Sequence, residues 1–207
     1  LSLGSIYALI ALGYTMVYGI LKLINFAHGD VFMVGAYAGY YCAGWLGVQG
    51  YESSGAGFPL FLGLLVLCFA MASVALLGVS IEGLAYRPVR SAPRLTPLIT
   101  AIGVSLFLQN AAMLVFSPNP RRYPAILSEV RFELGGVILT NIKLAIFAVA
   151  MLLMLGLHLL VQKTWPGRAM RALSMNADAA RLMGINVNAT IRATFAIGSA
   201  LAAAGGI

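Results

Sequence analysis

The sequence predicts an all-α protein, a polytopic transmembrane helix bundle that carries a small extracytoplasmic β-hairpin. Of the 207 residues, 61% are hydrophobic and 9% are charged, and the mean hydropathy is +0.93. A soluble domain usually carries about 25% charged residues, so this composition excludes a soluble enzyme, a secreted disulfide scaffold and a disordered tail. Because one bilayer span needs about 20 apolar residues, the chain has room for up to about six spans.

Apolar runs with few or no ionisable residues mark the expected spans. We expect helices, because the strands of a membrane barrel would alternate in polarity over about ten residues. Five runs are long enough to span and a sixth is cut short by the end of the chain: residues 1–21, 23–51, 53–81, 95–120, the stretch between Lys143 and Lys163, and 193–207. Since both chain ends lie within apolar runs, residues 1–207 are expected to be one transmembrane domain, truncated at the C-terminus and at the N-terminus as well.

Two basic segments between the runs predict the topology. Residues 87–94 include three arginines and no acid, and residues 163–192 include five basic residues and one acid, Asp178. Loops rich in Lys and Arg stay in the cytoplasm, so both segments are placed there, and Leu1 is placed outside by counting spans. The basic residues behind the net charge of +7 lie between the apolar runs, where they are explained by the topology. No nucleic-acid partner is therefore expected.

The loop 117–142 then lies outside, and it contains the hairpin signal. Residues 130–134 alternate apolar and charged side chains, Gly135-Gly136 are expected to form a two-residue turn, and residues 137–140 are expected to form the returning strand. This pattern predicts two short antiparallel strands.

The segment Asn25–Asp30 interrupts the apolar sequence with three polar side chains, and its candidate path residues are Asn25, Phe26, His28, Gly29 and Asp30. Such groups at membrane depth usually face a pathway, and interrupted helices near the midplane are where transporters place substrate. A tight turn at the membrane surface, with Asn25 or Asp30 capping the next helix, is an equally good interpretation.

A second polar pair, Gln109-Asn110, lies in the middle of the uncharged run 95–120. The two amides are expected to hydrogen-bond between helices or to line the same path.

The basic segment 164–192 is expected to hold two short helices. Thr164 is a candidate cap for the first helix, Asn176 for the second, and Gly184 is a natural C-terminal stop. Ala179, Leu182 and Met183 would share one face of the second helix. An apolar face flanked by charge favours a docking surface for a partner, the alternative being a helix that rests on the membrane.

Small residues at four-residue spacing predict close helix contacts. They occur at Gly35 and Gly39, and again at Gly198, Ala202 and Gly206.

Several motifs are missing from the sequence. No lysine follows a glycine as in a phosphate-binding loop, and there is no nucleophile elbow or His-Glu-x-x-His motif. Cys42 and Cys68 lie in apolar stretches and give no sign of a disulfide or a metal site. We therefore expect no catalytic residue, no metal and no cofactor.

Three N-terminal blocks, Gly4–Leu9, Gly13–Gly19 and Ile24–Asp30, closely resemble the start of the LivH-type permease family, membrane subunits of the bacterial ATP-binding-cassette (ABC) importer for branched-chain amino acids. Residues 167–172 and 183–186 are similar to the same family.

The resemblance implies that residues 164–192 form the cytoplasmic loop that couples the permease to its ATPase. ABC permeases present the pattern Glu-Ala-Ala-x-x-x-Gly there, and Asp178-Ala179-Ala180 followed by Gly184 matches it with Asp in place of Glu. The Leu-Pro that often follows is absent. The coupling residues expected on this basis are Gly167, Arg168, Arg171, Asn176, Asp178, Ala179, Ala180, Gly184 and Asn186.

The resemblance also implies a complex in the bacterial inner membrane. Its members would be a second homologous permease subunit, two cytoplasmic ATP-binding subunits and an extracytoplasmic substrate-binding protein. This chain would provide a gated path and perform no covalent chemistry. Two alternatives remain: a similar permease for urea, short amides or other amino acids, and an ATP-independent channel or secondary carrier.

Overall fold

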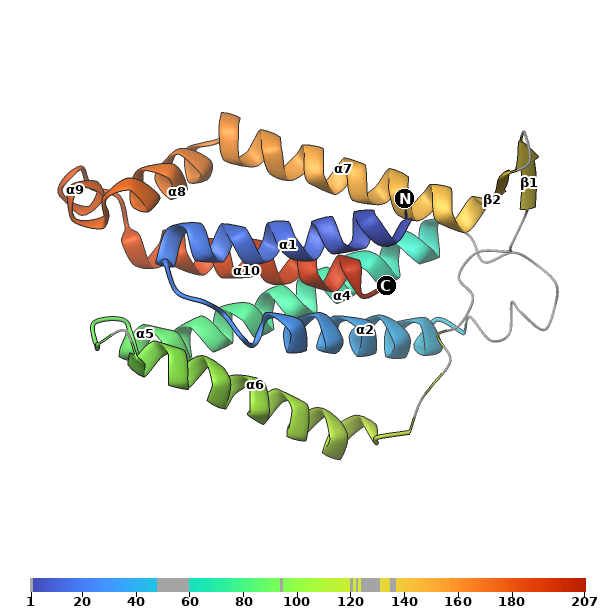
Figure 1. Cartoon of the computed structure of the whole chain (residues 1–207), viewed down its shortest axis with the longest axis horizontal. Helices are drawn as coiled ribbons and strands as arrows, with labels where there is room; N and C mark the ends of the chain where they lie inside the picture. Colours follow the sequence, from blue (N-terminus) through green and yellow to red (C-terminus); the bar gives the residue numbers. More distant parts are fainter. Residues whose placement is uncertain are drawn as a thin grey trace.

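The computed structural model describes residues 2–47, 60–93, 95–119, 121, 123, 131–134 and 137–207. This part of the chain is nearly all helical, and its long helices run side by side (Figure 1). In chain order the elements are α1 (Ser2–Leu21), α2 (His28–Trp45), α4 (Leu60–Ile81), the π-helix η1 (Glu82–Tyr86), α5 (Arg87–Val89), α6 (Leu95–Phe116), β1 (Arg131–Leu134), β2 (Val137–Thr140), α7 (Asn141–Lys163), α8 (Trp165–Met175), α9 (Ala177–Leu182) and α10 (Val187–Gly205).

Five helices of the described part are long and apolar enough to cross a membrane: α1, α4 with its continuation to Val89, α6, α7 and α10. The run 23–51 contributes α2, which is not among them. Its first turn carries His28 and Asp30, and the helix tolerates them because protein surrounds it on several sides.

The last helix is longer than expected. The apolar run begins at residue 193, but α10 begins at Val187 and reaches Gly205. Its first turns therefore lie within the segment 164–192, and its 19 residues are long and apolar enough to cross a membrane.

The strands β1 and β2 pair antiparallel, with Arg131 opposite Thr140 and Leu134 opposite Val137. The expected turn at Gly135-Gly136 lies outside the described residues.

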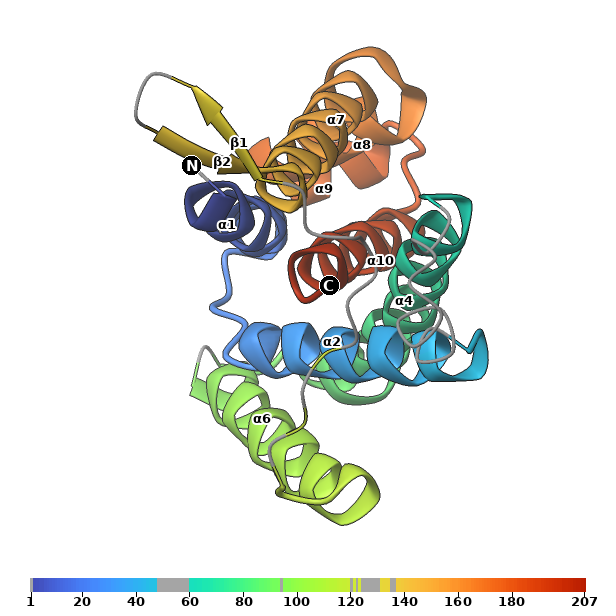
Figure 2. The ribbon, with the colours of Figure 1, turned by 90° about the vertical axis from the view of Figure 1, so that its right-hand side faces the viewer.

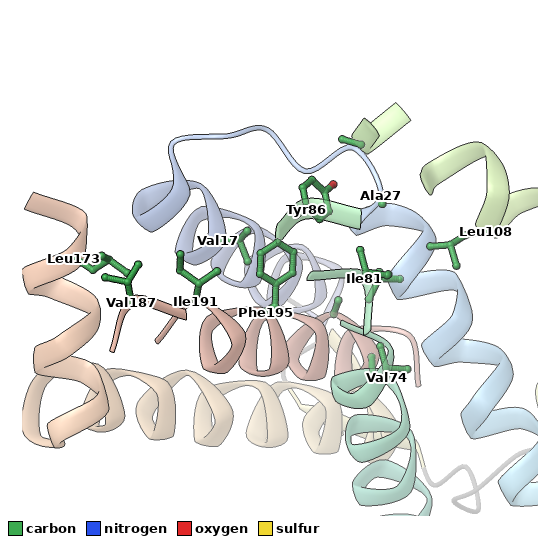
Figure 3. Close-up of a cluster of buried hydrophobic side chains, with 14 of the residues drawn as sticks. Val17, Ala27, Val74, Ile81, Tyr86, Leu108, Leu173, Val187, Ile191 and Phe195 are labelled. Atoms are coloured by element: carbon green, nitrogen blue, oxygen red, sulfur yellow. The ribbon is translucent and has the colours of Figure 1, made fainter. Parts of the chain in front are cut away.

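Helix α10 is the centre of the bundle. Over half of its span, 56%, is buried, against 6% for α7. Seen end-on, α10 is surrounded by α1, α2, α4 and α7, and α6 packs on the outer side of α2 (Figure 2). A central cluster of buried side chains joins α1, α2, α4 and α10 (Figure 3), with contributions from Val17, Val31, Val74, Ile191 and Phe195.

Small residues allow α10 to approach α1 and α2 closely, as the four-residue spacing predicts. A Cβ atom at Gly13 would lie 2.6 Å from the carbonyl oxygen of Gly198, and one at Gly35 would lie 2.6 Å from the Cα of Ala203. Neither position can hold a side chain without moving a helix. The prediction of small-residue helix contacts is confirmed at both places.

Both basic segments lie at one end of the bundle, as the alternation of spans predicts. This end, the basic end, carries Lys22, Arg87, Arg90, Lys163 and the helices α8 and α9 (Figure 1). The strands and both chain ends lie at the opposite end (Figure 1).

Replacing Gly13 by leucine should destabilise the bundle by about 1–3 kcal/mol, because the new side chain would overlap the backbone of α10. Gly19→Leu, in the same helix but with no atom within 4 Å of a Cβ, is the matched control. Thermal unfolding in detergent should show a lower midpoint for Gly13→Leu alone. Equal midpoints for the two variants would contradict the α1–α10 packing.

Candidate functional site

The segment between α1 and α2 turns back into the bundle. α1 ends at Leu21, and Lys22 adopts a left-handed φ of 52°. At the start of α2, the Nε2 atom of His28 donates to the carbonyl oxygen of Ile10 at 3.2 Å. Ile10 precedes Leu21 by eleven positions, which is about 16 Å along the helix axis. The segment therefore carries His28 to the middle of α1, which a tight turn at the helix ends would not do.

His28 and Asn25 are buried at this depth, with 4% and 7% of their surfaces exposed. The His28 ring also meets Tyr14 edge to face, with 5.8 Å between ring centroids. Asn25 accepts a hydrogen bond of 2.7 Å from the hydroxyl of Tyr86, in η1. The partners of both side chains come from other helices, so the segment is held in place by the bundle.

Asp30 connects α2 to α6. Its carboxyl group accepts hydrogen bonds from Ser105 Oγ at 2.5 Å and from Gln109 Nε2 at 3.0 Å. The structure thus brings Gln109 to Asp30. It does not bring Asn110, whose amide donates to Leu106 of its own helix at 2.7 Å and lies exposed.

A groove of about 500 Å³ runs between α1 and this segment. Its wall is mostly apolar. Small-molecule sites usually combine such a wall with a few polar groups that fix the orientation of the ligand. The lining residues are Tyr7, Ile10, Ala11, Tyr14, Thr15, Asn25, Phe26, His28 and Gly29. Asp30 and Gln109 are not among them.

The helices α8 and α9 are capped as the sequence predicts. The hydroxyl of Thr164 accepts from Gly167 N at 3.3 Å, and Asn176 Oδ1 accepts from the amides of Asp178 and Ala179, each at 3.0 Å. These predictions of caps are confirmed.

Gly184 stops α9 with a φ of 81°, a conformation that glycine adopts without strain. The amides of Gly184 and Ile185 bond back to Arg181 and Ala180, both at 3.1 Å, which completes a Schellman motif. Asn186 then caps α10 by accepting from Ala189 N at 3.0 Å. Little chain therefore separates α9 from the central helix.

Two expected coupling residues hold α8 against α7 instead of facing outward. Gly167 is buried against the carbonyl oxygens of Leu160 and Val161, and Arg171 donates to the carbonyl oxygen of Val161. Arg168 is exposed.

Exposed side chains surround α9, including Met175 at the end of α8. We define the α9 tip as Met175, Asp178, Ala179, Leu182 and Met183, all of them exposed, with Leu182 at 90%. Ala180 points inward and is 2% exposed. The tip combines apolar contact area with an adjacent acid, on the outermost helix of the basic end (Figure 1).

Sequence reasoning missed Glu82, the first residue of η1. Its side chain is fully buried, binds Arg90, and lies with Oε2 3.5 Å from Arg192 Nε. Arg90 also donates to Asn188 Oδ1 at 2.9 Å. The sequence signal for it is that Glu82 directly follows the uncharged run 53–81, a position that is also typical of the end of a span.

Burial lowers the pKa of Arg90 below the usual value of an arginine, an effect that the neighbouring Glu82 carboxylate opposes. Within the described residues, no three His, Cys, Asp or Glu side chains lie together in a way that could hold a metal ion.

These features define a multi-pass membrane protein. Over residues 1–207 the chain matches the family described as branched-chain amino acid transport system, permease component, and it belongs to that family.

The relatives are permeases by name. The chain is 43% identical to the high-affinity branched-chain amino acid transport system permease protein BraD of Pseudomonas aeruginosa, over 98% of this chain and 66% of BraD. It is 40% identical to the permease proteins LivH of Salmonella typhimurium and Escherichia coli, over all of this chain and 67% of each relative. The chain thus spans about two thirds of their length. No solved structure matches it significantly.

The adjacent amides of α6 offer a test of the α2–α6 contact. Gln109→Leu removes a hydrogen bond to Asp30 and should cost about 1 kcal/mol of stability. Asn110→Leu should change stability by no more than about 0.5 kcal/mol, because the Asn110 amide hydrogen-bonds only to Leu106 of its own helix, at an exposed position. Thermal unfolding in detergent measures both variants. A larger loss for Asn110→Leu would mean that the assignment of the two residues is reversed.

Proposed function

We propose that this chain is a membrane-spanning subunit of an ABC importer that carries branched-chain amino acids across the bacterial inner membrane. The family and the names of the relatives support this proposal. The observation that carries it is the polar segment 25–29, which lines a mostly apolar groove at the middle of α1. A branched-chain amino acid presents an apolar side chain and a small charged head, and this wall offers surfaces for both.

The groove is open on the α1 side, where Tyr7 is 68% exposed. We infer that a second, homologous permease subunit covers this face and completes the path. In this arrangement Asn25, Phe26, His28 and Gly29 form part of the path, whereas Asp30 and Gln109 position α2 from behind it.

The basic end is assigned to the cytoplasm by the positive-inside rule. The α9 tip there is the proposed docking site for one of two ATP-binding subunits, which hydrolyse ATP while this chain performs no chemistry. The strands β1 and β2 then lie outside, on the side where an extracytoplasmic binding protein would deliver substrate.

Uptake of radiolabelled leucine into proteoliposomes that hold the complex with its partner subunits tests this function. Uptake should require ATP and should be competed by isoleucine and valine. Uptake without ATP would indicate a channel or a secondary carrier. Competition by urea or short amides would indicate that the importer carries those solutes instead.

Within the same assay, Leu182→Asp should reduce uptake by about tenfold or more, because a charge would enter an apolar docking surface. Gln162→Asp adds the same charge to an exposed position at the end of α7 and should keep uptake. Equal uptake by the two variants would remove the docking role of the α9 tip.

A further inference from the structure

The buried acid Glu82 and its helix η1 have no role in the function proposed above. η1 is a single π-helical turn between α4 and α5. Such turns are rare and are frequent at functional sites. Glu82 and Tyr86, its first and last residues, are both buried, at 0% and 3% exposure. The turn therefore presents one ionic and one phenolic group to the interior.

Glu82 faces the start of α10. Arg90 bridges from Glu82 to Asn188, in the first turn of α10, and Arg192 approaches Glu82 from the next turn. Because Asn186 caps α10 directly after α9 ends, these contacts join η1 to the helix that leaves the α9 tip.

Tyr86 faces the segment Asn25–Gly29, which lines the groove. Its hydroxyl donates to Asn25, and its ring packs against Phe195 of α10 with 5.4 Å between centroids. In Figure 3 the Tyr86 hydroxyl lies beside Ala27, while the ring lies over Phe195. One turn of helix thus contacts the groove wall on one side and α10 on the other.

The ionic contact is incomplete in this structure. Glu82 Oε2 is buried without a hydrogen-bond partner, and Arg192 Nε stays 3.5 Å away. A normal bond between such groups is about 2.7–2.9 Å. The Arg192 side chain is still 46% exposed, so a small shift of α10 would complete the bond. A buried carboxylate oxygen without a donor is unfavourable, which favours such a shift.

We propose that Glu82, Arg192 and Tyr86 are positioning residues that link the α9 tip to the Asn25–Gly29 segment. When an ATP-binding subunit engages the tip, α10 moves, the Arg192–Glu82 bond forms, and Tyr86 moves Asn25 at the groove wall. This inference rests on the proposed function, since it describes how ATP hydrolysis reaches the substrate path.

The test is the amount of leucine taken up per ATP hydrolysed, measured in proteoliposomes for Tyr86→Phe, Arg192→Gln and the double variant. Each single variant should lower this ratio by about tenfold, within the usual range of coupling between sites. The double variant should be no worse than either single one, because both changes break the same connection. ATP hydrolysis and assembly of the complex should persist.

Two further variants separate coupling from simple structural damage. Arg192→Lys keeps a cation beside Glu82 and should recover much of the ratio that Arg192→Gln loses. Arg87→Gln removes an exposed cation from the same end and should leave the ratio unchanged.

An unchanged ratio in Tyr86→Phe and Arg192→Gln, beside active wild type, would overturn this inference and leave the proposed function standing. Losses that multiply in the double variant would also overturn it. A wild-type complex without ATP-dependent uptake would overturn the proposed function and this inference together.

Discussion

Polar side chains buried among helices need hydrogen-bond partners from the protein, and Asn25, His28 and Asp30 present this need most strongly. Water would satisfy these side chains at an exposed helix end, but they are buried, His28 beside Ile10 in the middle of α1, so the bundle has to do so. The absence of a side chain at Gly13 allows α10 to approach α1 and leaves room for the His28 ring. The π-turn supplies a hydroxyl to Asn25, and α6 is held to α2 through Asp30. Much of the packing around α2 follows from this one constraint.

The same arrangement relates the two ends of the proposed mechanism. α10 packs against both α1 and α2, which border the groove, and only Ile185 and Asn186 separate it from the Gly184 stop of α9. A shift of a helix so deeply buried also displaces its neighbours, because they approach it closely at Gly13 and Gly35. In the proposed importer, movement at the basic end would therefore reach the groove through packing and through the η1 contacts.

The sequence was sufficient for most of the spans, the two basic segments and the caps, because each depends on local chemistry. Thr164, Asn176 and Gly184 act within their own helix turns. The path of residues 22–27 could not be predicted, since a surface turn and a re-entry share the same sequence pattern. Gln109 and Asn110 were equivalent in sequence, and only the packing of α6 on α2 separates them. The burial of Glu82 could not be predicted, because its partner Arg192 is distant in the sequence and only the fold brings the two together.

The position of the groove is tested most directly by whether residue 26 lies inside the membrane yet in contact with water. A water-soluble maleimide would be reacted with Phe26→Cys in a variant whose Cys42 and Cys68 are replaced by alanine. Lys22→Cys at the exposed basic end and Leu106→Cys on the outer face of α6 are the references. If residue 26 lines a groove inside the membrane, its rate should be below that of residue 22 and well above that of residue 106. A rate equal to that of residue 22 would mean a surface turn, and a rate equal to that of residue 106 would mean no water-filled groove; either result would contradict the account.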